Sequence, residues 1–131
     1  GMPIMEVKMR QVKLYGTTDG TDGTAGALTI TYGHKVVGLL QAVEWIDGDF
    51  TDGVGAVISV DRDDDAADVI LLTLTAANDD AWYYPRVTAD SNTGTEITTK
   101  FVSPVVSGKL KLAVTSGGSV KTGGCIVYVE E

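Results

Sequence analysis

Three alternating aspartates form the stretch of this chain that most closely resembles a reactive site. Asp61, Asp63 and Asp65 supply carboxylate oxygens, which are the ligands that calcium prefers. An EF-hand loop would also need glycine at its sixth position and glutamate at its twelfth, where this chain has Ala66 and Leu72. Because charge runs usually face water, we interpret the stretch as a solvated acidic turn. We expect no metal and no cofactor, and keep a calcium site of another type at the three aspartates as the alternative.

The side chains needed for catalysis do not form a familiar motif. His34 is the one histidine, and its neighbours Gly33 and Lys35 are typical of a turn. Nucleophile-elbow, phosphate-loop and zinc-protease motifs are all missing from the sequence. We therefore expect a protein that is not an enzyme.

The densest aromatic cluster is the run from Trp82 to Arg86. Tryptophan, tyrosine and arginine dominate the anchors of protein interfaces, so the run could form a binding or subunit-contact surface. An edge strand with alternately buried rings fits the same residues equally well. In a strand, Tyr83 and Tyr84 should point to opposite faces. The predicted contact residues are Trp82, Tyr83, Tyr84, Arg86 and Tyr128.

Composition favours one globular all-β domain spanning residues 1–131. Valine, isoleucine and threonine account for 40 of the 131 residues, and hydrophobic residues for 44%. No apolar run approaches the roughly 20 residues that span a membrane. The first residues lack the features of a signal peptide, and Gly1 before Met2 is typical of an expression-tag remnant. The single cysteine, Cys125, is expected to lie in the core as a free thiol.

The net charge of −8 comes from one segment. Residues 47–80 contain ten aspartates and one arginine, for a net charge of −9, whereas the rest of the chain sums to +1. A protein that binds duplex nucleic acid needs clustered lysine and arginine, so we expect no nucleic-acid partner.

Alternating apolar residues between glycine- and aspartate-rich turns predict a series of short strands. The expected strands are Ile4–Tyr15, Ala27–Tyr32, Val36–Ile46, Ala56–Val60, Val69–Thr75, Tyr83–Thr88, Ile97–Val102, Leu110–Thr115 and Cys125–Val129. Such a series is typical of an antiparallel β-sandwich, with a jelly roll as one version.

Four of these strands carry more specific expectations. Val36–Ile46 also fits a helical period, but its glycine boundaries and the surrounding strands favour a strand. The first strand needs a β-bulge near Arg10 to keep its apolar residues on one face. Val69–Thr75 is apolar on both faces and should be central in a sheet. Pro85 removes one backbone donor and should place the strand Tyr83–Thr88 at an edge.

The last two strands, joined by a glycine-rich link, predict a β-hairpin. In the favoured register Leu110 lies opposite Val129, and Lys109 lies opposite Glu130. A tighter turn at Gly117 gives another register.

Four segments in the C-terminal part of the chain form a recognisable series: Trp82–Val87, Asp90–Gly94, Ser103–Val105 with Gly108–Leu112, and the closing Val127–Val129. With them, this part of the chain resembles small proteins encoded in the structural modules of phages and prophages, near capsid and head–tail connector genes. Residues 34–75 agree with that family only in their pattern of strands and acidic turns. The resemblance implies a virion-associated structural or accessory protein, made in the bacterial cytoplasm. It would act by contact with other virion proteins or with its own copies.

A calcium-dependent carbohydrate-binding module is the alternative function. Aromatic faces stack on sugar rings, and aspartate-rich loops hold calcium. This function requires the aromatic run and the turn at Asp61–Asp65 to lie on one concave face, with calcium bound there. Aromatic residues beneath a symmetric subunit contact would favour the virion protein.

Overall fold

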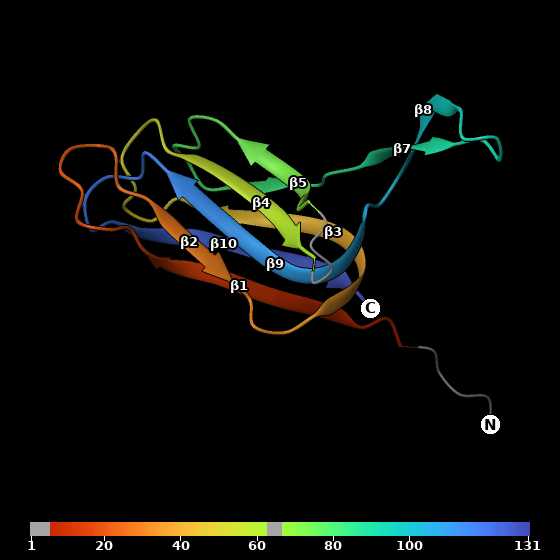
Figure 1. Cartoon of the computed structure of the whole chain (residues 1–131), viewed down its shortest axis with the longest axis horizontal. Coiled ribbons are helices and arrows are strands. Elements are labelled where there is room, and N and C mark those ends of the chain that lie inside the picture. The colour runs from red at the N-terminus through yellow and green to blue at the C-terminus, as the bar shows by residue number, and fades with distance from the viewer. Residues whose placement is uncertain (1–5, 63–66) are drawn as a thin grey trace.

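The computed structural model describes residues 6–62 and 67–131, and all regular structure in these residues is β-strand (Figure 1). The strands are β1 (Met9–Thr17), β2 (Leu28–Thr31), β3 (Val36–Ile46), β4 (Gly55–Asp61), β5 (Val69–Leu74), β6 (Ala81–Tyr83), β7 (Val87–Asp90), β8 (Glu96–Val102), β9 (Val105–Thr115) and β10 (Thr122–Glu130). The strand predicted over Val36–Ile46 is confirmed with the same bounds. No helix that could cross a membrane occurs in the described ranges.

Eight of the strands form two packed layers, which confirms the antiparallel sandwich. One layer has the order β1-β10-β3-β6, and the other has the order β2-β9-β4-β5. The pairs β1·β10, β2·β9, β3·β6 and β4·β5 are those of one long antiparallel ribbon wound around itself. This winding is a jelly roll.

Strand β9 links the two layers at one corner. Its residues up to Gly108 pair with β3, whereas its residues from Lys109 onward pair with β4. Gly108 has a φ of 147°, and a Cβ there would lie 2.6 Å from the carbonyl oxygen of Asp61. Glycine at this position therefore allows the strand to cross from one layer to the other.

The core lies between the layers and is built from alternate residues of the central strands. Trp45 is fully buried, and its Nε1–H donates to the carbonyl oxygen of Ala77 at 2.9 Å. Its ring stacks on Phe50 at a centroid distance of 5.8 Å. Cys125 is also fully buried and free, as the sequence predicts. Other fully buried side chains are Leu14, Leu40, Val43, Ile58, Leu110, Leu112 and Val127.

The predicted C-terminal hairpin is wrong, because β9 and β10 are central strands of different layers. Leu110 lies opposite Val60, and Lys109 lies opposite Asp61. Every strand of either layer needs one apolar side that faces the core. The alternation in β9 and β10 is therefore the same whether the two strands pair with each other or with other strands. The last three residues of the glycine link, Thr122 to Gly124, belong to β10, where a Cβ on Gly124 would lie 2.1 Å from the carbonyl oxygen of Leu14 in β1.

Two other expectations are also wrong. β1 pairs with β10 without any register shift, so there is no bulge near Arg10. The strand begins at Met9, and Val7 is exposed before it, whereas Ile4 and Met5 lie outside the described residues. β5 is an edge strand, because among the described strands it pairs with β4 alone.

Candidate functional site

Strands β7 and β8 form a hairpin that projects from one end of the sandwich (Figure 1). We call residues 87–102 the arm. Within the described sheets, β7 and β8 pair only with each other, and every residue of β8 is exposed. Its turn is closed by hydrogen bonds from Gly94 N to Ser91 O at 2.9 Å and from Ser91 N to Thr95 O at 2.8 Å. The arm is therefore an ordered element whose β8 strand is not covered by the rest of the described chain.

The arm begins where the strand predicted over Tyr83–Thr88 is interrupted. β6 lies at the edge of its layer, as Pro85 predicts, but the pairing stops after Tyr83. The chain then leaves the sandwich through residues 84–86 and pairs again only within the arm. The edge position is confirmed, and the continuous strand is corrected to two separate ones.

Both ends of the arm are fixed to neighbouring residues of β3. The Arg86 guanidinium donates to the carbonyl oxygen of Gln41 at 3.3 Å and to that of Pro85 at 2.7 Å. On the returning side, Leu40 N donates to the carbonyl oxygen of Pro104 at 2.9 Å. These bonds define the root of the arm and its direction of departure.

A β-bulge in β3 makes this root possible. β10 pairs Tyr128 with Ala42 and Val129 with Leu40, so Gln41 is an extra residue without a partner in that strand. Bulges leave the extra residue outside the ladder and bend the strand locally. The carbonyl of Gln41 is thereby free to accept the bond from the arm's root.

Trp82 and Tyr128 meet on the outer face of the sheet beside the root. Their ring centroids are 5.3 Å apart, with planes tilted by 36°. Trp82 remains 50% exposed. Burial raises the pKa of the Tyr128 phenol, and the nearby carboxylate of Glu44 raises it further. The structure thus brings together two of the predicted contact residues that lie far apart in the sequence.

The predicted alternation of Tyr83 and Tyr84 is confirmed. Tyr83 packs against the hydrophobic core, whereas Tyr84 is 63% exposed. Arg86, which we predicted as a contact residue, directs its guanidinium to backbone carbonyls of its own chain.

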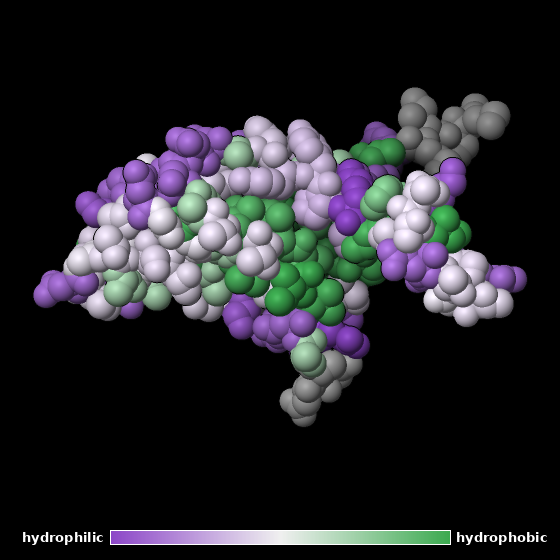
Figure 2. All heavy atoms as spheres, turned by 90° about the horizontal axis from the view of Figure 1, so that it is seen from above, coloured by the Kyte–Doolittle hydropathy of each residue, from purple (hydrophilic) through white to green (hydrophobic). Residues whose placement is uncertain are grey.

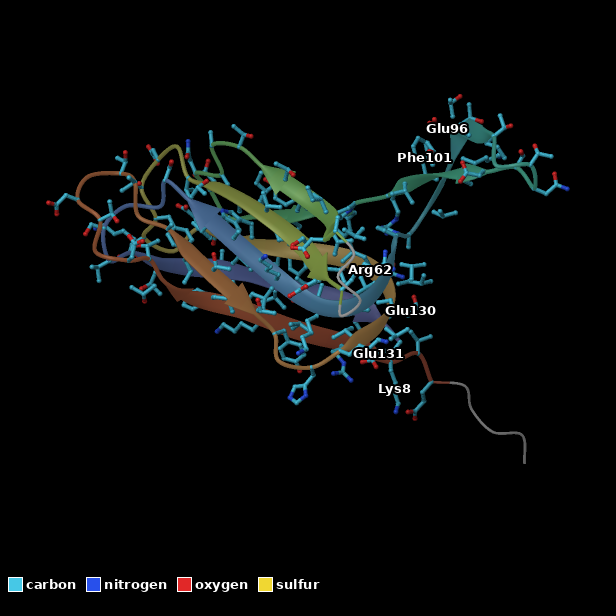
Figure 3. The ribbon with its side chains drawn as sticks, viewed as in Figure 1. Lys8, Arg62, Glu96, Phe101, Glu130 and Glu131 are labelled. Carbon is cyan, nitrogen blue, oxygen red and sulfur yellow. The ribbon has the colours of Figure 1, made fainter. Side chains whose placement is uncertain are left out.

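The arm itself carries apolar side chains that the sequence analysis did not assign to the site. Phe101 is 63% exposed and, like Glu96, stands clear of the sandwich (Figure 3). Val87 and Val102 are cross-strand partners and share one face of the arm. Other exposed apolar residues of the arm and its return are Ile97 and Val105. The signal that could have identified the arm is proline, because Pro85 and Pro104 stand on either side of it.

Of the acidic turn, only Asp61 and Arg62 lie in the described residues. Asp61 ends β4, in the layer opposite to Trp82, and Asp63 and Asp65 lie outside the described residues. Within residues 6–62 and 67–131, no three histidine, cysteine or acidic side chains are grouped to hold a metal. His34 is exposed in the turn before β3, as predicted, with its ring edge-on to Tyr32 at 5.4 Å.

A second group of aspartates surrounds Asp47. The Oδ1 atom of Asp47 is buried without a hydrogen-bond partner, and its backbone N–H donates to Asp80 Oδ1 at 2.8 Å. Burial raises the pKa of the Asp47 carboxyl, and repulsion from Asp80, Asp52 and Asp79 adds to the shift. This end of the sandwich therefore holds mutually repelling charges at neutral pH.

No protein-family model matches the chain, and neither curated proteins nor solved structures show significant similarity to it. The arm, its root and the neighbouring aromatic residues are thus the features from which function can be inferred.

Proposed function

We propose that this protein is a virion-associated structural or accessory protein of a phage or prophage, acting by protein–protein contact through its arm. Capsid decoration, head–tail joining and a tail accessory role all fit such a contact. The observation that carries the proposal is the exposed arm, whose β8 strand has no buried residue and which carries the exposed apolar side chains Val87, Phe101 and Val102.

An uncovered hairpin of this kind is suited to binding rather than to standing free in water. An isolated two-stranded hairpin is marginally stable, and exposed apolar groups such as Phe101 gain free energy when they are covered. The anchored root reduces the freedom that the arm would lose on binding. Tyr84, which is exposed just before the root, extends the same surface.

The jelly roll is compatible with the proposal but does not select it. Viral capsid proteins and lectins both use this architecture, so the function must follow from the site. Small rigid β-modules suit assemblies in which many copies are related by symmetry. We accordingly propose self-association or contact with other virion proteins, synthesis in the bacterial cytoplasm, and no nucleic-acid or membrane partner.

The calcium-dependent carbohydrate-binding module remains the second candidate, because the half-exposed Trp82 ring could stack on a sugar. Calcium that binds only the folded protein would raise its melting temperature. We expect no such rise. A rise that is lost in Asp63→Asn would support this second function.

The proposal is tested with phage particles produced by the source bacterium. In a matched variant, a short Gly-Ser link replaces residues 87–102, which is sterically simple because Val87 and Val102 are cross-strand partners. We expect the wild-type protein to co-purify with particles at a constant ratio to the capsid protein, and the arm-replaced variant to be lost from them. Absence of the wild-type protein from particles would contradict the proposal.

A further inference from the structure

Strand β5 is a sheet edge without charges of its own, and its one irregularity is a β-bulge at Leu71, because β4 pairs Ile58 with Leu72 and Ser59 with Ile70. From Val69 to Leu74 it has no charge, proline or glycine, and among the described strands it pairs only with β4. Val69 and Ile70 are 42% and 63% exposed. Natural edges are usually kept short, charged or covered, because an open edge is a template for another chain.

The other described edges of the sandwich have the protection that β5 lacks. β1 carries Arg10 and Lys13 along its length. β2 and β6 have only four and three residues, and Pro85 follows β6 closely. The open edge at β5 is thus a particular property of that strand rather than of the fold.

An ion pair and a depression border the start of β5. Asp68, which precedes the strand, is paired with Lys111, with 3.2 Å between Oδ2 and Nζ. A depression of about 200 Å³ lies beside the start of β5, lined by Val60, Arg62, Val69, Val105 and Ser107. Val105 is the first residue of β9 after the arm, so this depression connects β5 with the root. Apolar side chains also gather in the middle of the face seen from above, with further ones at the arm (Figure 2).

We propose that the β5 edge is the acceptor for the arm of a second copy of this chain, and that two copies exchange arms about a twofold axis near their roots. The inference rests on the proposed function of the arm and names its partner. The two elements have similar numbers of residues, six in β5 and seven in β8, and each contains an irregularity in its register with its own partner strand.

The position of the acceptor favours a second copy over the arm's own chain. The arm points away from the sandwich, whereas β5 starts beside the root and runs back along the sandwich (Figure 1). A twofold rotation near the root places a second sandwich beneath the arm and returns the partner's arm to the first β5. Such an arrangement is closed and leaves neither edge open. Two strand-length contacts together approach the roughly 1,000 Å² of a specific interface.

The proposal is tested by cross-linking between two variants that each carry one added cysteine. One copy carries Ile70→Cys in β5, and the other, tagged to differ in mass, carries Thr99→Cys in the arm. The native Cys125 does not interfere, because it is fully buried and burial raises the pKa of its thiol to about 12. After mixing and treatment with a short bismaleimide, we expect a covalent species containing one copy of each variant.

The control replaces Ile70→Cys with Val120→Cys. Val120 has the same 63% exposure but lies in the link between β9 and β10, and it should give no mixed product. Mixed product from the Ile70–Thr99 pair no greater than in this control would overturn the exchange. A dominant product joining two Ile70→Cys copies would overturn it in favour of pairing between two β5 edges.

A second pair of variants tests the acceptor without chemical labels. Ile70→Lys should convert the assembly to monomers with little change in Tm, whereas Val120→Lys should leave the assembly intact. If both variants assemble as the wild type does, β5 is not the acceptor. If replacing residues 87–102 still abolishes assembly in that case, the arm's proposed function survives and only its acceptor is wrong.

Discussion

Tyr83 and Tyr84 are adjacent, yet they lie in different environments. Truncating each side chain should therefore change the stability of the protein by a different amount. Tyr83→Ala removes a ring that packs against the core, and we expect a loss of about 2 kcal/mol in the free energy of unfolding. Tyr84→Ala removes a ring that is 63% exposed, and should cost less than about 0.5 kcal/mol. Urea unfolding measures both losses, and light scattering measures assembly. Equal losses of stability would contradict the orientation of the two rings.

Asp47 should make stability depend on pH in an unusual direction. Its folded-state pKa is raised, first by burial and then by its acidic neighbours, so the folded protein holds the proton more tightly than the unfolded chain. The resulting stabilisation is present below the ordinary carboxyl pKa of about 4 and is lost as pH rises through the raised pKa. At neutral pH the charge is therefore unfavourable.

We expect Asp47→Asn to raise Tm at pH 7, and the gain to shrink as the pH falls toward the ordinary carboxyl range. The matched control is Asp22→Asn, because Asp22 is exposed in the loop between β1 and β2. Thermal unfolding across the pH range measures both variants. A gain in Asp47→Asn that is independent of pH would show that the removed charge is not its cause.

At the scale of elements, the root of the arm depends on Arg86. Arg86→Ala removes two hydrogen bonds to backbone carbonyls, which we expect to cost about 1 kcal/mol locally. Arm amides should then exchange faster with deuterium, whereas amides of the core strands keep their protection. The matched control is Arg10→Ala, which removes a guanidinium paired with Glu131 outside the arm. Unchanged exchange of the arm in Arg86→Ala would contradict its anchoring role.

The elements could be predicted from local patterning, but their partners could not. Alternation correctly predicts β3, because one face of that strand lies in the core. The same alternation in β9 and β10 fits a hairpin equally well, since pairing depends on strands far away in the sequence. β5 shows a related difficulty. Its apolar residues on both faces predict a central strand, but the strand lies at an open edge.

The candidate site was predicted in its aromatic part only. Residue type predicts Trp82 and Tyr128 as contact residues, and the fold brings their rings together. The sequence of β8 ends in Phe101 and Val102, as a strand within the sandwich could. Nothing in this local sequence shows that β8 leaves the sandwich. The bulge at Gln41 depends on a register between β3 and β10 that the sequence does not show.

At the scale of the whole molecule, a closed jelly-roll core carries two uncovered features near one end, the arm and the start of the β5 edge. The core is buried without help from the arm, and the exposed apolar side chains of the arm are the reason that we propose a partner for it. Assembly through the arm is the central claim about this protein.

The most direct test is the mass in solution of the wild-type protein and of the variant with residues 87–102 replaced, measured by sedimentation over a range of concentrations. We predict that the wild type forms dimers or larger assemblies, and that the variant is monomeric with a nearly unchanged Tm. A wild type that stays at its monomer mass of 13.7 kDa at the highest soluble concentration, and is retained by no capsid or tail protein, would contradict the claim.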